Sequence, residues 1–216
     1  MARRGIPFVV SAPSGTGKTT VCRALVDADP GLRFSVSHTT RPPRPREREG
    51  EDYHFVNRER FGELVATGAF LEHAEYAGNL YGTSWAAIDE PLAAGMDLLL
   101  EIEVQGAAQV HVRRADARLV FLLPPSFAAL EERLRGRGSD PPAAVQARLE
   151  LARREFAAVE GFDYVIVNDE LARCVAALRE VIEAERRGEG AAARARHGRE
   201  AVLPKVKGSL PLGASG

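Results

Sequence analysis

Four short runs of almost unbroken apolar residues stand out along the chain. They cover residues 7–11, 97–102, 119–123 and 164–167. Strands of a parallel sheet are buried on both faces, so they read as continuous apolar runs rather than as alternating ones. The four runs therefore predict the core strands of a parallel β-sheet.

Amphipathic helical patterns lie between and after these runs. They cover residues 18–27, 126–135, 142–159 and 171–187, with apolar positions recurring at helical spacing. Strands that alternate with helices are typical of a domain in which helices cover both faces of a sheet. We predict an α/β fold with a three-layer core built on a parallel sheet.

A different pattern interrupts this rhythm at residues 33–92. Short alternating pieces such as FSVSHTT, YHFV and FLEHAEYAG flank a stretch rich in Pro, Arg and Glu, and a helix is predicted at 58–67. Alternation indicates strands with one buried face. We therefore predict an inserted lobe with a mixed or antiparallel sheet at residues 33–94, and a core formed by residues 1–32 and 95–187.

The apolar pattern weakens towards the end of the chain. Residues 186–207 carry seven Lys or Arg against two Glu, among many Ala and Gly residues. Segments of this composition bury little apolar surface and usually stay solvated. We interpret residues 188–216 as a basic, flexible tail in solution, with contact to RNA or to another partner as the alternative.

Composition and charge narrow the class of protein. The formal net charge of -1 gives no overall attraction to nucleic acid or to an anionic membrane, so phosphate ligands require locally placed cations. Cys22 and Cys174 form no CxxC pair, which disfavours a disulfide framework and fits the reducing cytoplasm. The apolar run near residue 7 is too short for a signal peptide or a membrane span. We expect a cytoplasmic protein with no nucleic-acid or membrane partner, and a homo-oligomer stays open.

A glycine-rich loop joins the first predicted strand to the first predicted helix. Residues 12–19 read APSGTGKT. Backbone N–H groups of such a loop surround a polyphosphate, its Lys reaches the β- and γ-phosphates, and the following Thr can bind Mg²⁺. The loop indicates a nucleotide but not a reaction. The residues predicted to bind ATP here are Ala12, Pro13, Ser14, Gly15, Thr16, Gly17, Lys18, Thr19 and Thr20.

Further motifs follow the loop at regular intervals. They are SVSHTTRPPRPRE, EGEDYHFV, FLEHAEYAGNLYGTS, EIEVQG, RLRGRG and VIVND, in that order. With these motifs the chain resembles the guanylate kinase family from about residue 8 to residue 187, and the TTRxxR and YGTS elements are more diagnostic than the loop. The resemblance implies a P-loop nucleoside monophosphate kinase, with Mg²⁺ as cofactor, that transfers a phosphoryl group from ATP to GMP.

In that family the inserted lobe binds GMP. The resemblance implies that Arg41 and Arg44 clamp the GMP phosphate, to which the guanidinium fork is well suited. It implies that Glu72 accepts hydrogen bonds from guanine N1–H and the exocyclic amine, and that Ser37 and Thr83 donate to O6. Adenine would leave such buried groups mispaired. The remaining implied GMP contacts are Tyr53 and Tyr81 at the phosphate, and Glu75 near the base.

The resemblance also implies a mobile lid over ATP at about residues 133–155, with Gly136 and Gly138 as hinge candidates. Positive charge that a lid places over a transferring phosphoryl group offsets its developing negative charge. The matching residues on the ATP side are Arg133, Arg137, Arg148 and Asn168. Those expected to stabilise the transition state are Lys18, Arg41, Arg137 and Arg148.

The motif EIEVQG departs from the family pattern, which usually has Asp-x-Asp. Here Glu101 and Glu103 keep the charge, but each side chain is one methylene longer. We expect Thr19 to bind Mg²⁺ and Glu101 to bind it directly or through water. We expect Glu103 to contact GMP.

Two other functions compete with this interpretation. Guanylate-kinase-like domains also serve as inactive protein-binding modules, but these typically have an impaired phosphate loop, whereas APSGTGKT is intact. A kinase for another acceptor, such as a ribose phosphate, would leave Glu72, Ser37 and Thr83 without partners. The sequence therefore favours GMP as the acceptor.

Overall fold

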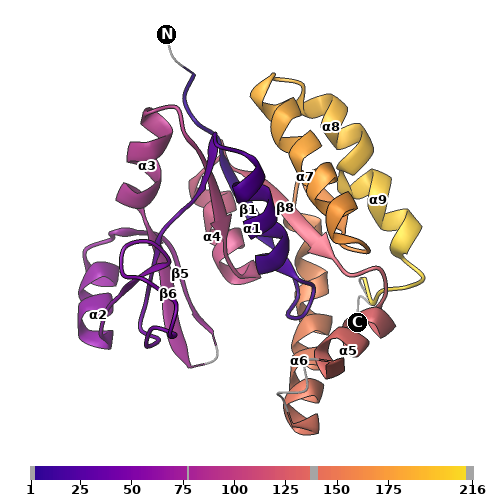
Figure 1. Ribbon diagram of the computed structural model, residues 1–216, viewed down its shortest axis with the longest axis horizontal. Helices are drawn as coiled ribbons and strands as arrows, with labels where there is room; N and C mark the ends of the chain where they lie inside the picture. The colour runs from indigo at the N-terminus through magenta and orange to yellow at the C-terminus, as the bar shows by residue number, and fades with distance from the viewer. Residues whose placement is uncertain (1–2, 77, 137–140, 213–216) are drawn as a thin grey trace. The chain divides into compact units, whose positions relative to one another are not determined.

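The structure is a computed structural model that describes residues 3–76, 78–136 and 141–212 (Figure 1). The chain divides into two compact units. The first contains residues 1–9 and 30–117, and the second contains residues 10–29 and 118–216. Strand β1 (Pro7–Ser11) is divided between them.

The first unit contains part of a parallel sheet. Its strand order is β2-β7-β1, and β2 (Leu32–Phe34) runs parallel to β7 (Asp97–Glu101). The buried carboxylate of Asp97 fixes this region, because it accepts hydrogen bonds from the backbone N–H of Ile6 at 2.7 Å and from Arg3 at 2.9 Å. The strand predicted at 97–102 therefore begins at a buried aspartate, and each oxygen of its carboxylate accepts one hydrogen bond.

A four-stranded mixed sheet forms the rest of the β structure in this unit. The strand order is β4-β3-β6-β5. β3 (Ser37–Thr39) runs parallel to β4 (Tyr53–Phe55), and β6 (Asn79–Ser84) runs antiparallel to both β3 and β5 (Phe70–Tyr76). This sheet corresponds to the mixed or antiparallel lobe that the alternating pattern predicted.

The described residues of the first unit form three helices, and local sequence accounts for where two of them begin. α2 (Arg58–Ala66) follows Asn57, whose side chain accepts from the N–H of Arg60. α3 (Trp85–Ala93) follows Ser84, which caps it in the same way. α4 (Val104–Arg113) was not predicted, because its glycine and valines are poor helix formers.

The second unit contains the rest of the parallel sheet. Its order is β1-β8-β9, and β8 (Arg118–Leu123) runs parallel to β9 (Tyr164–Val167). Helix α1 (Lys18–Ala28) packs against α7 (Leu171–Arg186), and an ion pair of 2.7 Å joins Arg186 to Asp29. The parallel core predicted from the apolar runs is confirmed.

The predicted lid falls on two helices of the second unit. α5 (Phe127–Gly136) and α6 (Pro142–Glu155) pack against each other. The helix predicted at 142–159 stops being α-helical at Glu155 and continues as a 3-10 helix, η1 (Phe156–Gly161). Arg137 and Gly138 lie outside the described residues.

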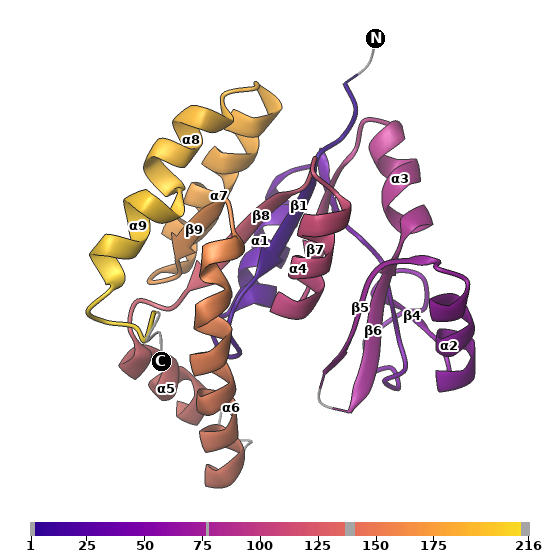
Figure 2. The same ribbon diagram turned by 180° about the vertical axis from the view of Figure 1, so that it is seen from behind.

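The end of the chain differs from the flexible tail that the composition suggested. It forms two short helices, α8 (Gly190–His197) and α9 (Arg199–Val206). In Figure 2, α8 lies beside α7 and α9 follows α8 along the same edge; both α8 and α9 contact β9. Three apolar residues of this segment, Ala193, Val206 and Leu210, are buried. Their partners are distant in sequence, so local pattern did not reveal them.

A buried carboxylate ties this C-terminal segment to the core. Glu185 accepts hydrogen bonds from the Tyr164 hydroxyl and from Arg118 at 2.8 Å, and it pairs with Arg194 of α8 at 3.3 Å. Burial, together with the hydrogen bond to Glu185, raises the pKa of Tyr164, so the hydroxyl stays protonated as the donor. Gly198 also bridges to Tyr164 in antiparallel fashion, which covers part of the β9 edge.

This network predicts that removing the Tyr164 hydroxyl lowers the stability of the fold. Replacing Tyr164 with phenylalanine leaves the buried Glu185 carboxylate with one donor fewer, and we expect a loss of about 1–3 kcal/mol in the free energy of unfolding. Urea denaturation measures this quantity. The control is Arg187→Ala, which breaks an exposed ion pair with Glu189 and should change stability by no more than about 0.5 kcal/mol. Equal stability of Tyr164→Phe and wild type would contradict the assigned network.

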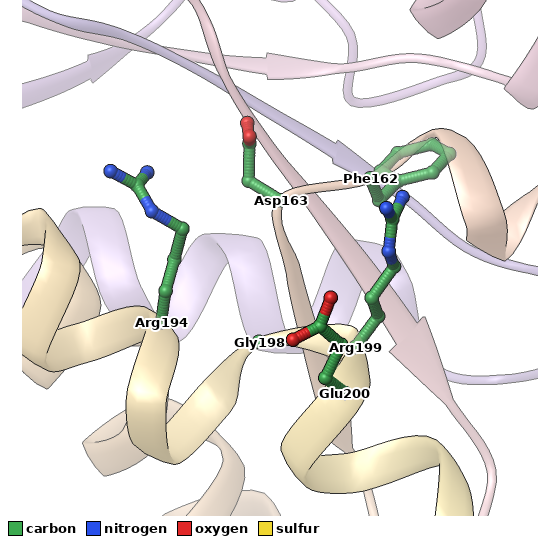
Figure 3. A pocket seen from close by; sticks show the side chains of 6 residues that line it. All are labelled: Phe162, Asp163, Arg194, Gly198, Arg199 and Glu200. Carbon is green, nitrogen blue, oxygen red and sulfur yellow. The ribbon is translucent and has the colours of Figure 1, made fainter.

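A small hollow of about 230 Å³ lies beside the same helices (Figure 3). Figure 3 shows Arg194 and Arg199 extending on either side of Gly198. The Asp163 carboxylate accepts from the N–H of Leu119, and Arg199 donates to the carbonyl of Glu160. These polar groups are satisfied within the protein.

No helix among the described residues combines the length and apolar character that crossing a membrane requires.

Candidate active site

The phosphate loop has the backbone geometry that its sequence requires. Gly15 and Gly17 have φ values of 91° and 95°, in the left-handed region that favours glycine. A Cβ on Gly15 would also lie 2.7 Å from a methyl carbon of Leu134, and one on Gly17 would lie 2.8 Å from the Asn168 amide nitrogen. Both glycines are therefore required by conformation and by space.

Side chains from two other segments support the loop from one side. The amide of Asn168, at the end of β9, donates to the Thr16 carbonyl at 2.7 Å. Arg133 of α5 donates to the same carbonyl at 3.3 Å and to the Asn168 carbonyl at 2.8 Å. These residues line an open pocket of about 520 Å³ beside the loop. Leu171, which the sequence analysis missed, also lines it and is 42% exposed.

The first turn of α1 follows the loop directly. Lys18 is its first residue, and Thr19 and Thr20 are exposed on the same turn. The N-terminus of a helix attracts anions through its unpaired N–H groups and its dipole. Of the residues predicted to bind ATP, Gly15, Thr16, Gly17, Thr20, Arg133 and Asn168 line the pocket beside the loop.

Helix α6 reaches the loop through a residue that the sequence analysis did not select. Glu155, which is buried, accepts a hydrogen bond from the backbone N–H of Ser14 at 3.2 Å. Arg148 lies seven residues earlier, two helical turns away on the same face. The base of the predicted lid is therefore tied to the phosphate loop, and Arg148 lies on the helix face that meets it.

In the first unit, strand alternation gathers most of the predicted GMP residues on one face of the mixed sheet. Thr83 of β6 is opposite Glu72 of β5, and Ser37 of β3 is opposite Tyr53 of β4. The rings of Tyr53 and Tyr81 are 6.1 Å apart on this face. The opposite face carries histidines and phenylalanines that pack together, including His38 against His54 and Phe70.

A chain of hydrogen bonds fixes the buried carboxylate on this face. Thr83 donates its hydroxyl hydrogen to Glu72 Oε1 at 2.6 Å, and the hydroxyls of Ser37 and Thr83 are 2.9 Å apart. Because Thr83 has one hydroxyl hydrogen, Ser37 is the donor in the second bond. Donation from Ser37 and Thr83 to guanine O6 would require this chain to reorganise, so that role stays a prediction. Glu72 is 3% exposed.

The predicted phosphate clamp is held by an acidic residue. Glu47 accepts from the Arg41 guanidinium and from the backbone N–H of Arg44, both at 2.8 Å. The hydrogen bond from Arg41 lowers the pKa of Glu47, and the same bond raises the pKa of Arg41. Arg41 also lies 5.5 Å from the centre of the Tyr53 ring. Glu47 thus binds Arg41 and the Arg44 backbone where a phosphate is expected, and the sequence analysis did not select it.

Comparison with known proteins agrees with this geometry. The guanylate kinase family model matches residues 4–185, most of the chain. This chain belongs to the guanylate kinase family. A guanylate kinase from Thiobacillus denitrificans is 53% identical over 169 residues, which cover 78% of this chain and 81% of the relative. Another, from Syntrophotalea carbinolica, is 50% identical over 185 residues, covering 86% and 88%.

A solved structure supports the fold of the family member described here. The crystal structure of guanylate kinase from Anaplasma phagocytophilum superposes with a TM-score of 0.69 at 34% identity, covering 86% of this chain and 88% of that one. The family and the α/β fold predicted from the sequence are therefore confirmed. The match ends near the end of α7, so α8 and α9 lie beyond the family model.

Three predicted guanylate kinase residues need separate mention. Glu75 is three residues from Glu72 on the same strand, so it points to the opposite face, and its side chain is 59% exposed near Arg58. The structure does not bring Glu75 to the group formed by Glu72, Thr83 and Ser37. Glu103 is the N-cap residue of α4, and Glu101 ends β7, so both lie near the start of that helix.

Proposed function

We propose that this chain transfers the γ-phosphoryl group of ATP to GMP and releases ADP and GDP. The observation that carries the proposal is the buried Glu72–Thr83–Ser37 group in a chain that belongs to the guanylate kinase family. A buried carboxylate that is held by hydroxyls on a sheet face is suited to reading two adjacent donors, which guanine offers and adenine does not.

The first unit binds the acceptor. Arg41 and Arg44 bind the GMP phosphate, which takes the position now held by the Glu47 carboxylate on Arg41. Tyr53 and Tyr81 lie beside this guanidinium, and their hydroxyls bind the same phosphate. Before GMP binds, Glu47 keeps the Arg41 guanidinium in place, so less order has to be gained when the phosphate replaces it.

The second unit binds the donor. The N–H groups of the loop and the N-terminus of α1 surround the ATP phosphates, and Lys18 contacts the β- and γ-phosphates. The adenine occupies the pocket between Arg133, Asn168 and Leu171. Ser14 exchanges Glu155 for a phosphate oxygen, which couples nucleotide binding to the base of α6.

Magnesium fits the donor side of this site. The described residues hold no cluster of three His, Cys, Asp or Glu side chains that would cage a metal ion. Mg²⁺ in kinases is instead bound by one or two protein oxygens together with substrate phosphates and water. The hydroxyl of Thr19, an exposed residue on the first turn of α1, is suited to this role, with Glu101 as the second candidate. When bound, the ion neutralises charge on the β- and γ-phosphates.

The chemistry requires no general base. The GMP phosphate is already an anionic nucleophile, so its oxygen attacks the γ-phosphorus while the bond from that phosphorus to the ADP oxygen breaks. The contribution of the protein is in-line positioning and charge neutralisation. Lys18 and Arg148 stabilise charge on the donor, and Arg41 does so on the acceptor. Arg137 is proposed for the same role from its sequence position.

A panel of acceptors tests this function. We expect turnover with GMP at a kcat/KM at least about 100-fold above that with AMP, CMP or UMP in a coupled assay of ADP release. Ribose 5-phosphate is included as the sugar phosphate acceptor. Equal rates with AMP would remove the guanine assignment, and ATP binding without turnover would favour a protein-binding module. We place the reaction in the cytoplasm, in keeping with two buried cysteines that form no disulfide.

A further inference from the structure

We propose that helix α4 positions Glu72 for guanine recognition. In this proposal Gly106 provides the space for the Glu72 carboxylate, and Gln109 fixes the strand that carries it. The inference rests on the proposed function, since it assigns positioning residues to the same guanine-binding group.

The first observation is the contact between Gly106 and Glu72. Gly106 is buried in the first turn of α4, and a Cβ built there would lie 2.4 Å from Glu72 Oε2 and 3.1 Å from Glu72 Cδ. The next nearest atom, a methyl carbon of Ile102, would be at an ordinary 3.5 Å. A methyl group at this position would therefore conflict with the Glu72 carboxylate and with little else.

The second observation is that α4 holds the backbone on both sides of Glu72. The Gln109 side-chain amide accepts from the N–H of His73 at 3.2 Å and donates to its carbonyl at 2.7 Å. Arg113 donates to the carbonyl of Leu71 at 2.8 Å. β5 is an edge strand of the mixed sheet, so these side chains take the place of a neighbouring strand.

The three α4 positions act as one surface. Residues 106, 109 and 113 are three and four apart, so they lie on one face of the helix along the β5 edge. On the other side of the carboxylate, Thr83 holds Oε1 at 2.6 Å. Glu72 is therefore confined between Thr83 and Gly106, which fixes the plane in which its two oxygens can accept hydrogen bonds.

Without Glu72, replacing Gly106 with alanine would stabilise helix α4. Alanine is the best helix former and glycine among the worst, and residue 106 lies in an ordinary helical conformation. Glycine at position 106 thus lowers the stability of the helix but leaves room for the Glu72 carboxylate.

Gly106→Ala tests the proposal through a specificity ratio. IMP has the N1–H of GMP but lacks the exocyclic amine, so a well-placed Glu72 should prefer GMP at least about tenfold in kcat/KM. In Gly106→Ala the carboxylate must move, and we expect the GMP/IMP ratio to fall to within about threefold of unity while the KM for ATP is unchanged. General damage to the fold would lower both acceptors by the same factor and leave the ratio intact.

Gly62→Ala is the matched control. Gly62 is also a helical glycine of the first unit, in α2, but a Cβ there meets nothing within 4 Å. We expect this variant to keep the wild-type ratio. Gln109→Met is the second test, because it keeps the length of the side chain and removes both hydrogen bonds to His73. Its GMP/IMP ratio should also fall, even if Gly106→Ala proves too unstable to assay.

The outcomes separate this inference from the function on which it rests. Wild type that fails to phosphorylate GMP would remove the proposed function itself. Wild type that prefers GMP over IMP, together with Gly106→Ala and Gln109→Met variants that keep the same preference, would overturn the positioning role and leave the function standing.

Discussion

Replacing Lys18 with alanine is expected to lower kcat for GMP phosphorylation at least about 10³-fold. Lys18 is the first residue of α1, immediately after the two left-handed glycines of the phosphate loop. Its ammonium group would neutralise charge that develops between the β- and γ-phosphates. Because the loop backbone remains to bind ATP, the effect on kcat should exceed the effect on the KM for ATP.

The chain offers a convenient control for this substitution. Its only other lysines are Lys205 and Lys207, and Lys205 is exposed on α9. Lys205→Ala should keep wild-type kcat, and circular dichroism of both variants shows whether they are folded. A folded Lys18→Ala enzyme that retains more than a tenth of wild-type kcat would show that the loop does not act on the transferring phosphoryl group.

Replacing Glu72 with glutamine should weaken GMP use about 100-fold in kcat/KM and leave the KM for ATP unchanged. In the proposed complex two carboxylate oxygens would accept from the two adjacent guanine donors, whereas a glutamine amide has one acceptor oxygen and one NH₂ donor. One hydrogen bond is lost, and an NH₂ group then faces a guanine donor in a buried site. Steady-state kinetics with GMP varied at saturating ATP measure the effect.

The control for Glu72→Gln is Glu63→Gln, which carries the same chemical change on exposed helix α2, where Glu63 pairs with Arg60. Its kinetics should match wild type. If Glu72→Gln had the same kcat/KM for GMP as wild type, the base-reading role assigned to the buried carboxylate would be wrong.

The elements that carry strong local patterns could be predicted from the sequence. The strand at 164–167 has the predicted bounds, and the strand at 7–11 does as well. Both are continuous apolar runs, so burial on two faces leaves a signal in adjacent residues. The phosphate loop could be predicted equally well, because the residues that form it are neighbours in the sequence.

What escaped prediction depends on contacts between distant segments. Glu155 is 141 residues from Ser14, and Glu185 is 67 residues from Arg118, so no local pattern could link them. The helices α8 and α9 also depend on distant segments, since α8 packs against α7 and β9, and α9 packs against β9. The domain boundaries predicted at residues 33, 95 and 188 stay predictions. The two compact units divide the chain after residues 9, 29 and 117.

Two differences in the candidate site could have been found from the sequence. Glu72 and Glu75 are an odd number of residues apart on one strand, so alternation already places them on opposite faces. Glu47 lies three residues after Arg44 in a loop rich in arginine, where a carboxylate is a natural partner for a phosphate clamp. In contrast, the contact of Gly106 with Glu72 required the three-dimensional structure.

The most direct test of the central claim is a competition among acceptors in one reaction. GMP, AMP, CMP and UMP at equal concentration are incubated with the protein, Mg²⁺ and ATP labelled on the γ-phosphate, and the nucleoside diphosphates are separated. The label in each product reports the ratio of kcat/KM values directly. The account predicts label almost entirely in GDP. Label mainly in ADP, CDP or UDP, or in no nucleotide product, would contradict it.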